Sequence, residues 1–294
     1  GTGDINIGAY KDLAANAIGD IYYTGTAIFA ESDTGSISVS TKAGTTISSE
    51  NEQGIELVTK GGTDNTITVK ALGDITTARY ALDIEHTGTG DVSVTTGGTI
   101  ASAGSTALDL DMRGAGNLTL VTNGAINGAI RGIFIDYAVG VTATSNGNIS
   151  TGDSDGLEID TVDSSENVIV NVNAVIAGDY DGLDVSKFGT GNTVVTLGSN
   201  GEIHGQRNTG VLIRGNAAGS AITVQGSSGT ITGERAGIDL ITENADILVQ
   251  NLELVSGGTY VGVFARSKGG KITIQNVDEI TSRDSTAVDV DTRD

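Results

Sequence analysis

Two Asp-rich segments spaced 26 residues apart have the residue types of a metal site. Residues 152–156 read Gly-Asp-Ser-Asp-Gly and residues 178–182 read Gly-Asp-Tyr-Asp-Gly. If the chain repeats at that spacing, both segments lie at one corner, and Ca²⁺, which prefers oxygen ligands, has four carboxylates available: Asp153, Asp155, Asp179 and Asp181. The same spacing places Arg131 level with Asp155 and Asp181, and Arg207 level with Asp153 and Asp179. We therefore favour an ion-pair ladder, with calcium as the alternative, and expect no cofactor.

A second set of carboxylates recurs in a unit with the pattern small, apolar, any, apolar, any, as in Ala81–Glu85 and Ala107–Asp111. In eleven such units, acids fill 13 of the 22 third and fifth positions. If the units stack as strands, these positions form one outward face, and carboxylates ~4.8 Å apart repel by about 1 kcal/mol even in water. The face is either a solvated surface or a binding surface for a cationic partner. The predicted binding face consists of eight acids and two apolar anchors. The acids are Glu56, Asp83, Asp109, Asp111, Asp136, Glu158, Asp160 and Asp184. The anchors are Phe134 and Leu212.

Enzymatic chemistry has weaker support in these residues. Two neighbouring carboxylates, such as Asp83 with Asp109 or Glu158 with Asp184, match the ~5 Å separation of a retaining glycosidase. However, the pairs repeat along the whole face, which has no Trp for sugar stacking. The two histidines, His86 and His204, fall at different corners, so we expect surface or corner positions and no catalytic triad. Outward Thr residues on another strand resemble ice-binding β-helices, but Thr is also simply a good strand former.

The elements that position these residues follow from an internal repeat. The eleven units start 24–28 residues apart, with a mean of 26, and all 22 of their second and fourth positions are apolar. Each period holds two further strand signals, of the type Ile67-Thr68-Val69 and the type Gly-x-Ile ending at Ile75. Alternation with a period of two predicts strands with one buried face, and no segment has the 3.6-residue period of a helix.

Three short strands in every 26 residues predict an all-β, right-handed parallel β-helix. Each strand pairs most simply with the same strand one period later, which makes the pairing parallel and the connection right-handed. About eleven coils with a rise of ~4.8 Å give a rod roughly 50 Å long. We expect a single solenoid over residues 1–294, and because neither end carries a recognisable cap, we expect it to be a fragment of a longer solenoid.

The composition excludes several classes of function. The 294 residues include 44 Gly but no Pro, Cys or Trp, and the formal net charge is −21. The absence of Cys excludes disulfides and thiolate metal sites. A nucleic-acid partner is excluded because its phosphates require Lys and Arg, and an anionic membrane surface is disfavoured for the same reason. The content of apolar residues, 37%, and their periodicity argue against disorder.

The repeat resembles the passenger domains of Gram-negative autotransporters, the type V secretion family. The resemblance rests on the Gly-Ile-Glu-Leu and Ala-Leu-Asp-Leu first strands, the Ser-Ile-Ser-Val and Thr-Ile-Thr-Val second strands and the Gly-Asp-Ile and Gly-Thr-Ile corners, and it covers residues 5–294. Among passengers the chain looks most like those of Bartonella and Brucella surface proteins, including a CAMP-like factor autotransporter. Such membership implies a signal peptide upstream, a membrane β-barrel downstream and export to the cell surface.

Residues and resemblance together predict a non-enzymatic adhesion module that binds a host cell-surface or matrix component, with a cationic component as one candidate. The expected chain is a monomer on the bacterial surface or in the extracellular space, without direct membrane insertion. A structural stalk that presents another region is the first alternative. A carbohydrate-active β-helix enzyme is the second.

Overall fold

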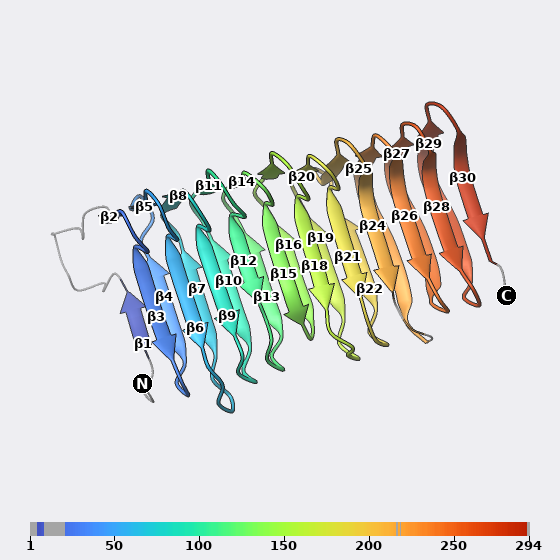
Figure 1. Cartoon of the computed structure of the whole chain (residues 1–294). Coiled ribbons are helices and arrows are strands. Elements are labelled where there is room, and N and C mark those ends of the chain that lie inside the picture. The colour runs from blue at the N-terminus through green and yellow to red at the C-terminus, as the bar shows by residue number, and fades with distance from the viewer. Residues whose placement is uncertain (1–4, 9–20, 216, 218, 293–294) are drawn as a thin grey trace.

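A computed structural model describes residues 5–8, 21–215, 217 and 219–292. Every regular element among them is a β-strand, and successive coils stack side by side along one axis from the N-terminus to the C-terminus (Figure 1). The chain is a parallel β-solenoid with about 26 residues per coil, which confirms the predicted fold class. Within the described residues no helix is long and apolar enough to cross a membrane.

The five-residue units form the first strand of each coil. They make an 11-stranded parallel sheet in the order of the chain. Its strands are β3 (Ile28–Ser32), β6 (Ile55–Thr59), β9 (Leu82–His86), β12 (Leu108–Asp111), β15 (Ile133–Ala138), β18 (Leu157–Thr161), β21 (Leu183–Lys187), β24 (Thr209–Gly215), β26 (Ala236–Thr242), β28 (Val261–Ser267) and β30 (Thr286–Asp291).

The other two strands of each coil belong to a 19-stranded sheet. The second strands are β1 (Ile5–Gly8), β4 (Ile37–Thr41), β7 (Ile67–Ala71), β10 (Val92–Thr96), β13 (Leu118–Thr122), β16 (Val141–Ser145), β19 (Val168–Val172) and β22 (Thr193–Leu197). The third strands are β2 (Ile21–Tyr23), β5 (Thr46–Ser49), β8 (Asp74–Thr77), β11 (Ile100–Ser102), β14 (Ile126–Gly128), β17 (Ile149–Thr151), β20 (Val175–Gly178) and β23 (Glu202–Gly205).

In the last three coils the second and third strands merge into one long strand. These are β25 (Ala221–Gly233), β27 (Asp246–Gly257) and β29 (Ile272–Ser282). The bend that separates two strands elsewhere falls at Asn251 in β27 and at Asn276 in β29, with φ angles of 55° and 51°. Asn is among the few residues with a side chain that adopt this left-handed conformation readily. The Asn276 amide donates to Oδ1 of Asn251 at 3.2 Å, so the two bends stack.

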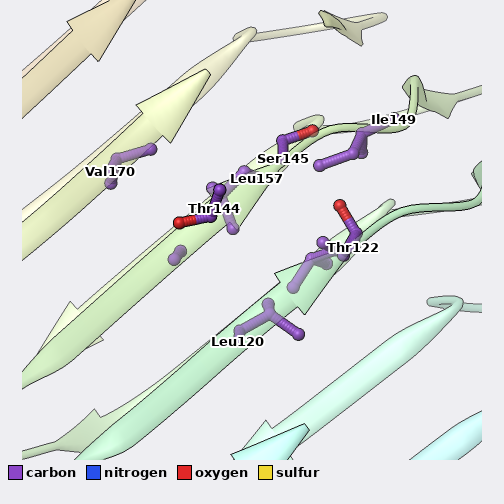
Figure 2. Close-up of a pocket in the computed structure, with 9 residues that line it drawn as sticks. Leu120, Thr122, Thr144, Ser145, Ile149, Leu157 and Val170 are labelled. Carbon is purple, nitrogen blue, oxygen red and sulfur yellow. The ribbon is translucent and has the colours of Figure 1, made fainter. Parts of the chain in front are cut away.

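The core is the column of inward apolar side chains from all three strands. The second and fourth unit positions are almost all buried; Leu57, Ile84 and Leu110, for example, are fully inaccessible. At the last coil the same positions are more open, and Val288 and Val290 are 37% and 46% exposed. One small cavity of about 10 Å³ interrupts the column where the inward position of β16 is Ala143, between Leu120 and Val170 (Figure 2).

Polar side chains line the inner side of the corner after the first strand, which the sequence did not lead us to expect. His86 ends β9 at such a corner, as predicted, but it is fully buried, so the predicted alternative of a surface position is wrong. Its Nδ1 lies 2.8 Å from Oγ1 of Thr59, and its Nε2 lies 2.8 Å from the carbonyl oxygen of Gly90. Lys187 is also fully buried and donates to the carbonyl oxygens of Ser164, at 3.1 Å, and Phe188. These partners satisfy the buried polar groups, as burial requires.

Candidate functional site

The predicted acidic face is assembled as the repeat implied. Pairing between first strands places Asp83 beside Asp109, and Asp109 beside Phe134. The same row continues from Phe134 to Glu158 and from Glu158 to Asp184. Third positions of successive units therefore form one row, and fifth positions form a second row beside it. We call the two rows together the acidic face.

The third-position row is less exposed than a solvated surface would be. Glu56, Asp83, Asp109, Glu158 and Asp184 are all only half-exposed. Leu212, predicted as an exposed apolar anchor, is only 1% exposed and therefore cannot serve as one.

The burial of Leu212 has a local cause. Its row neighbours are Asp184 and Asp239, and Asp239 is itself only 3% exposed. Side chains stacked at one strand spacing shield each other from water. Phe134, the second predicted anchor, is half-exposed.

Arginine side chains from the corners before β15 and β26 lie over this row. The Arg131 guanidinium carbon is 4.6 Å from the Phe134 ring centroid, and the same side chain forms an ion pair with Glu158. Four coils further along, Arg235 pairs with Asp239 at 3.3 Å. These contacts explain the partial burial, because a long side chain reaches across the sheet from its edge.

The Asp83 and Asp109 carboxyls lie in an environment that disfavours their ionised forms. Burial raises the pKa of Asp83 to about 7, and the neighbouring Asp109 adds to that rise. Burial likewise raises the pKa of Asp109 to about 6, with a further contribution from Asp111, against the opposing charge of Arg131. Desolvation and like charge both disfavour the ionised form of a carboxyl. Each of these groups is therefore easier to ionise when a cation lies beside it.

A second pair, Glu158 and Asp184, behaves in the same way on the other side of Phe134. Burial raises the pKa of Glu158 to about 7, although Arg131 opposes the rise. Burial also raises the pKa of Asp184 to about 7, and Asp181 adds to it. Oδ1 of Asp184 is buried without a hydrogen-bond partner.

The fifth-position row is more open and partly neutralised. Arg113 pairs with Asp111 at 2.7 Å and with Glu85 at 3.8 Å, and it is 56% exposed. Burial is the main reason that the pKa values of Asp111 and Asp136 are raised. Asp160 lies beside Ser186 on the next strand. This row supplies the accessible part of the negative charge.

The four aspartates of the predicted metal corner do not converge on one point. Asp153 and Asp179 face outward and pair with Arg207, with Asp153 at 3.4 Å, as the ladder hypothesis proposed. Asp155 and Asp181 point inward instead. Oδ1 of Asp155 accepts from the Asp181 backbone amide at 2.9 Å, and Oδ1 of Asp181 accepts from the Thr209 amide at 2.6 Å. Among the described residues no group of three or more His, Cys, Asp and Glu is placed to hold a metal ion.

The predicted role of Arg131 in that ladder is wrong. Its backbone is level with Asp155, since the Gly132 amide donates to the Asp155 carbonyl oxygen. Its side chain, however, turns onto the acidic face and pairs with Glu158. The stack of Arg131 on the Phe134 ring adds a cation–π contact that the alternative direction would lack.

Sequence reasoning also missed a hydrogen-bonded group on the third strands. His204 Nδ1 lies 2.7 Å from Oγ1 of Thr232, and His204 Nε2 lies 2.9 Å from Oε2 of Glu202. The signal was present, because Ile203 and Ile231 each end a Gly-x-Ile segment, and stacking these segments brings their flanking residues together.

Comparisons of the chain with protein-family models, with curated proteins and with solved structures found no match. The geometry of the chain therefore carries the functional argument. Two rows of carboxylates, several of them half-buried and difficult to ionise, face one side of a rigid sheet. Such an arrangement attracts cationic groups and gains free energy when a cation relieves the repulsion.

Proposed function

We propose that this chain is a binding module of a bacterial surface or secreted protein, a passenger of the autotransporter type, which adheres to host cells or matrix through its acidic face. The observation that carries this proposal is the in-register row of carboxylates on the first strands. Five of the seven carboxylates in the third-position row, Glu56, Asp83, Asp109, Glu158 and Asp184, lie beside another carboxylate at one strand spacing. The repulsion costs stability, and a partner that supplies positive charge removes that cost on binding.

The partner that fits this face is a protein surface rich in Lys or Arg. Long cationic side chains can reach half-buried carboxylates such as Asp83 and Asp109, while the open row at Asp111, Asp136 and Asp160 guides the encounter from a distance. Long-range attraction of this kind raises the association rate. The half-exposed ring of Phe134, covered on one side by Arg131, provides the apolar contact at the centre of the face.

The test is binding of the purified chain to a lysine-rich peptide and to cultured epithelial cells at increasing ionic strength. We expect the association rate to fall as salt rises, because screening sets in beyond ~8–10 Å at physiological ionic strength. A variant with Asp109, Asp111, Asp136 and Asp160 all changed to Asn should bind more weakly to both. It should remain folded, because each replacement removes like-charge repulsion.

The matched control changes outward positions on another sheet. Thr68→Ala and Thr119→Ala, on β7 and β13, should leave binding unchanged. Equal cell binding by the quadruple Asn variant and the unmodified chain would reject the acidic face. If charge replacements on every face of the solenoid leave binding unchanged, the stalk alternative is favoured, in which the solenoid only presents another region.

A further inference from the structure

The Glu202, His204 and Thr232 side chains form a carboxylate–imidazole–hydroxyl relay on the outer face of the third strands. Glu202 and His204 are two residues apart on β23, and Thr232 lies directly beside His204 on β25. The distances are 2.9 Å between Glu202 Oε2 and His204 Nε2, and 2.7 Å between His204 Nδ1 and Thr232 Oγ1. Both lie within hydrogen-bonding range for a base and its partners.

The chemistry of the partners fixes the direction of the hydrogen bonds. An ionised carboxylate only accepts hydrogen bonds, so Nε2 of His204 carries the proton that is donated to Glu202. In the neutral imidazole Nδ1 is then the acceptor, and the Thr232 hydroxyl donates to it. This is the arrangement in which an imidazole takes a proton from an attacking hydroxyl, with a carboxylate that orients the ring.

Two members of the relay, His204 and Thr232, line a groove with room for a small molecule. His204, Thr232 and Ser256 contribute to a cavity of about 380 Å³, which Glu234 and Arg283 also line. Arg283 reaches back across two coils and makes two hydrogen bonds with the Glu234 carboxylate, at 2.7 and 3.3 Å. Arg283 Nε also donates to Asp284 Oδ2 at 3.0 Å, so the guanidinium borders the groove as the centre of an ion-pair cluster and not as a free positive charge. The His204 and Glu202 side chains are 30% and 49% exposed, so solvent and substrate reach the relay.

We propose that this groove is an acyl-transfer site for small carboxylic esters, with Thr232 as the nucleophile, His204 as the general base and Glu202 as the positioning residue. The site lies on a different sheet from the acidic face and does not depend on the proposed binding function.

The reaction balances with water as the only co-reactant. Thr232 Oγ1 attacks the ester carbonyl carbon as its proton passes to Nδ1 of His204, and a new C–O bond forms. The tetrahedral intermediate collapses, the ester C–O bond breaks, and the leaving alkoxide takes the proton from Nδ1. Water then gives its proton to Nδ1 and attacks the acyl-Thr232 carbonyl, which releases the carboxylic acid and restores the hydroxyl. The imidazolium formed in each step is stabilised by Glu202.

The experiment measures p-nitrophenyl acetate cleavage by the whole chain, together with mass spectrometry of the peptide that contains Thr232. We expect p-nitrophenol release above the uncatalysed rate and an acetyl group on Thr232 in acid-quenched samples. Thr232→Val and His204→Gln should each lower the rate by about 10²-fold or more, the usual contribution of a general base. Thr232→Ser should retain activity, since it keeps the hydroxyl.

The matched control is Thr281→Val, which removes a hydroxyl from the same row two coils further along, where Thr281 donates to Ser256 at 3.0 Å. It should leave the rate and the acetylation unchanged. If the Glu202, His204 and Thr232 hydrogen bonds only stabilise the stacked strands, no acetylated Thr232 will form. The unmodified chain, Thr232→Val and Thr281→Val will then cleave the ester at equal rates, and that result would overturn the proposal. Circular dichroism of each variant confirms that the solenoid is intact before the rates are compared.

Discussion

Arg131 stacks on Phe134, with its guanidinium carbon 4.6 Å from the ring centroid, and at the same time forms an ion pair with Glu158. The three side chains come from a corner and from two neighbouring first strands, β15 and β18. Arg131 therefore ties one coil to the next on the outside of the solenoid, while it provides the positive charge between two pairs of carboxylates with raised pKa values.

Replacement of Arg131 by Ala should lower the free energy of unfolding by about 1 kcal/mol, through loss of the cation–π contact and of the partly buried ion pair. The pKa of Glu158 should rise further, because Arg131 opposes its present rise. Thermal unfolding and NMR titration of Glu158 provide the measurements. Arg113→Ala is the control. Arg113 also pairs with an acid and lies over Tyr137 at 5.8 Å, but it is 56% exposed, so its loss should change stability little.

The stability of the solenoid should decrease as the pH rises from about 4 to about 8. The pKa values of Asp83, Asp109, Glu158 and Asp184 are raised to about 7, 6, 7 and 7 by burial, so the folded state holds protons in this range that the unfolded state has released. When the folded state binds more protons, the free energy of unfolding falls with rising pH. These groups therefore destabilise the fold least below pH 4, and the penalty is complete only at about pH 8, about one pH unit above the highest of these pKa values.

Thermal unfolding at pH 5.5 and pH 8 checks this expectation, and the melting temperature should be higher at pH 5.5. A variant in which these four carboxyls become the corresponding amides should show a much flatter dependence. An unchanged slope in that variant would mean that the pH dependence has another origin, such as the net charge of −21.

Most of the fold was predictable because the repeat determines it. The register that pairs Asp83 with Asp109 follows from counting residues between units, and the observed pairing agrees with it. The direction of a corner side chain does not follow from the period. Arg131 could turn toward Asp155 or toward Phe134, and only the packing against the ring and Glu158 decides between them. The burial of Leu212 was missed for the same reason, since shielding by neighbours is a property of the assembled sheet.

The inward polar positions show another limit of the pattern. His86 and Lys187 both end a first strand, where the alternation continues inward but the chain begins to turn. Polar groups are tolerated there because carbonyl oxygens at the corner accept their hydrogen bonds. Their polar residue types alone indicate a surface position for His86 and Lys187. Only their hydrogen-bond partners explain why both can lie in the interior.

The inner aspartates of the Asp corner should stabilise the fold without any metal. Asp181 is 2% exposed and accepts hydrogen bonds from the Thr209 amide, at 2.6 Å, and from the Asn208 side chain, at 3.1 Å. Asp181→Ala leaves these donors unpaired and should cost about 1–3 kcal/mol. Asp153→Ala should cost little, because the Asp153 side chain is 73% exposed.

Thermal unfolding with EDTA or with millimolar Ca²⁺ should give the same melting temperature. A rise of several degrees with Ca²⁺ would restore the calcium hypothesis.

Filling the small internal cavity should stabilise the solenoid. The inward position occupied by Ala143 lies between Leu120 of β13 and Val170 of β19, and the resulting cavity of about 10 Å³ is bounded by apolar side chains that include Ile149 and Leu157 (Figure 2). Ala143→Val introduces the residue type found at this position in several other coils. The added methyl groups should therefore fit the column without a change in backbone conformation. Cavity-filling changes of this kind typically add about 0.5–2 kcal/mol, and we expect the lower end because the cavity is small.

The opposite change provides the control for the same site. Leu120→Ala enlarges the cavity and should cost about 2–5 kcal/mol. Chemical denaturation of both variants at constant pH measures the two effects on one scale. A loss of stability in Ala143→Val would show that the coil around β16 is narrower than its neighbours and cannot accept the larger side chain, because overpacking forces side chains out of their preferred rotamers. Equal stability of Leu120→Ala and the unmodified chain would contradict the assignment of this column as the core.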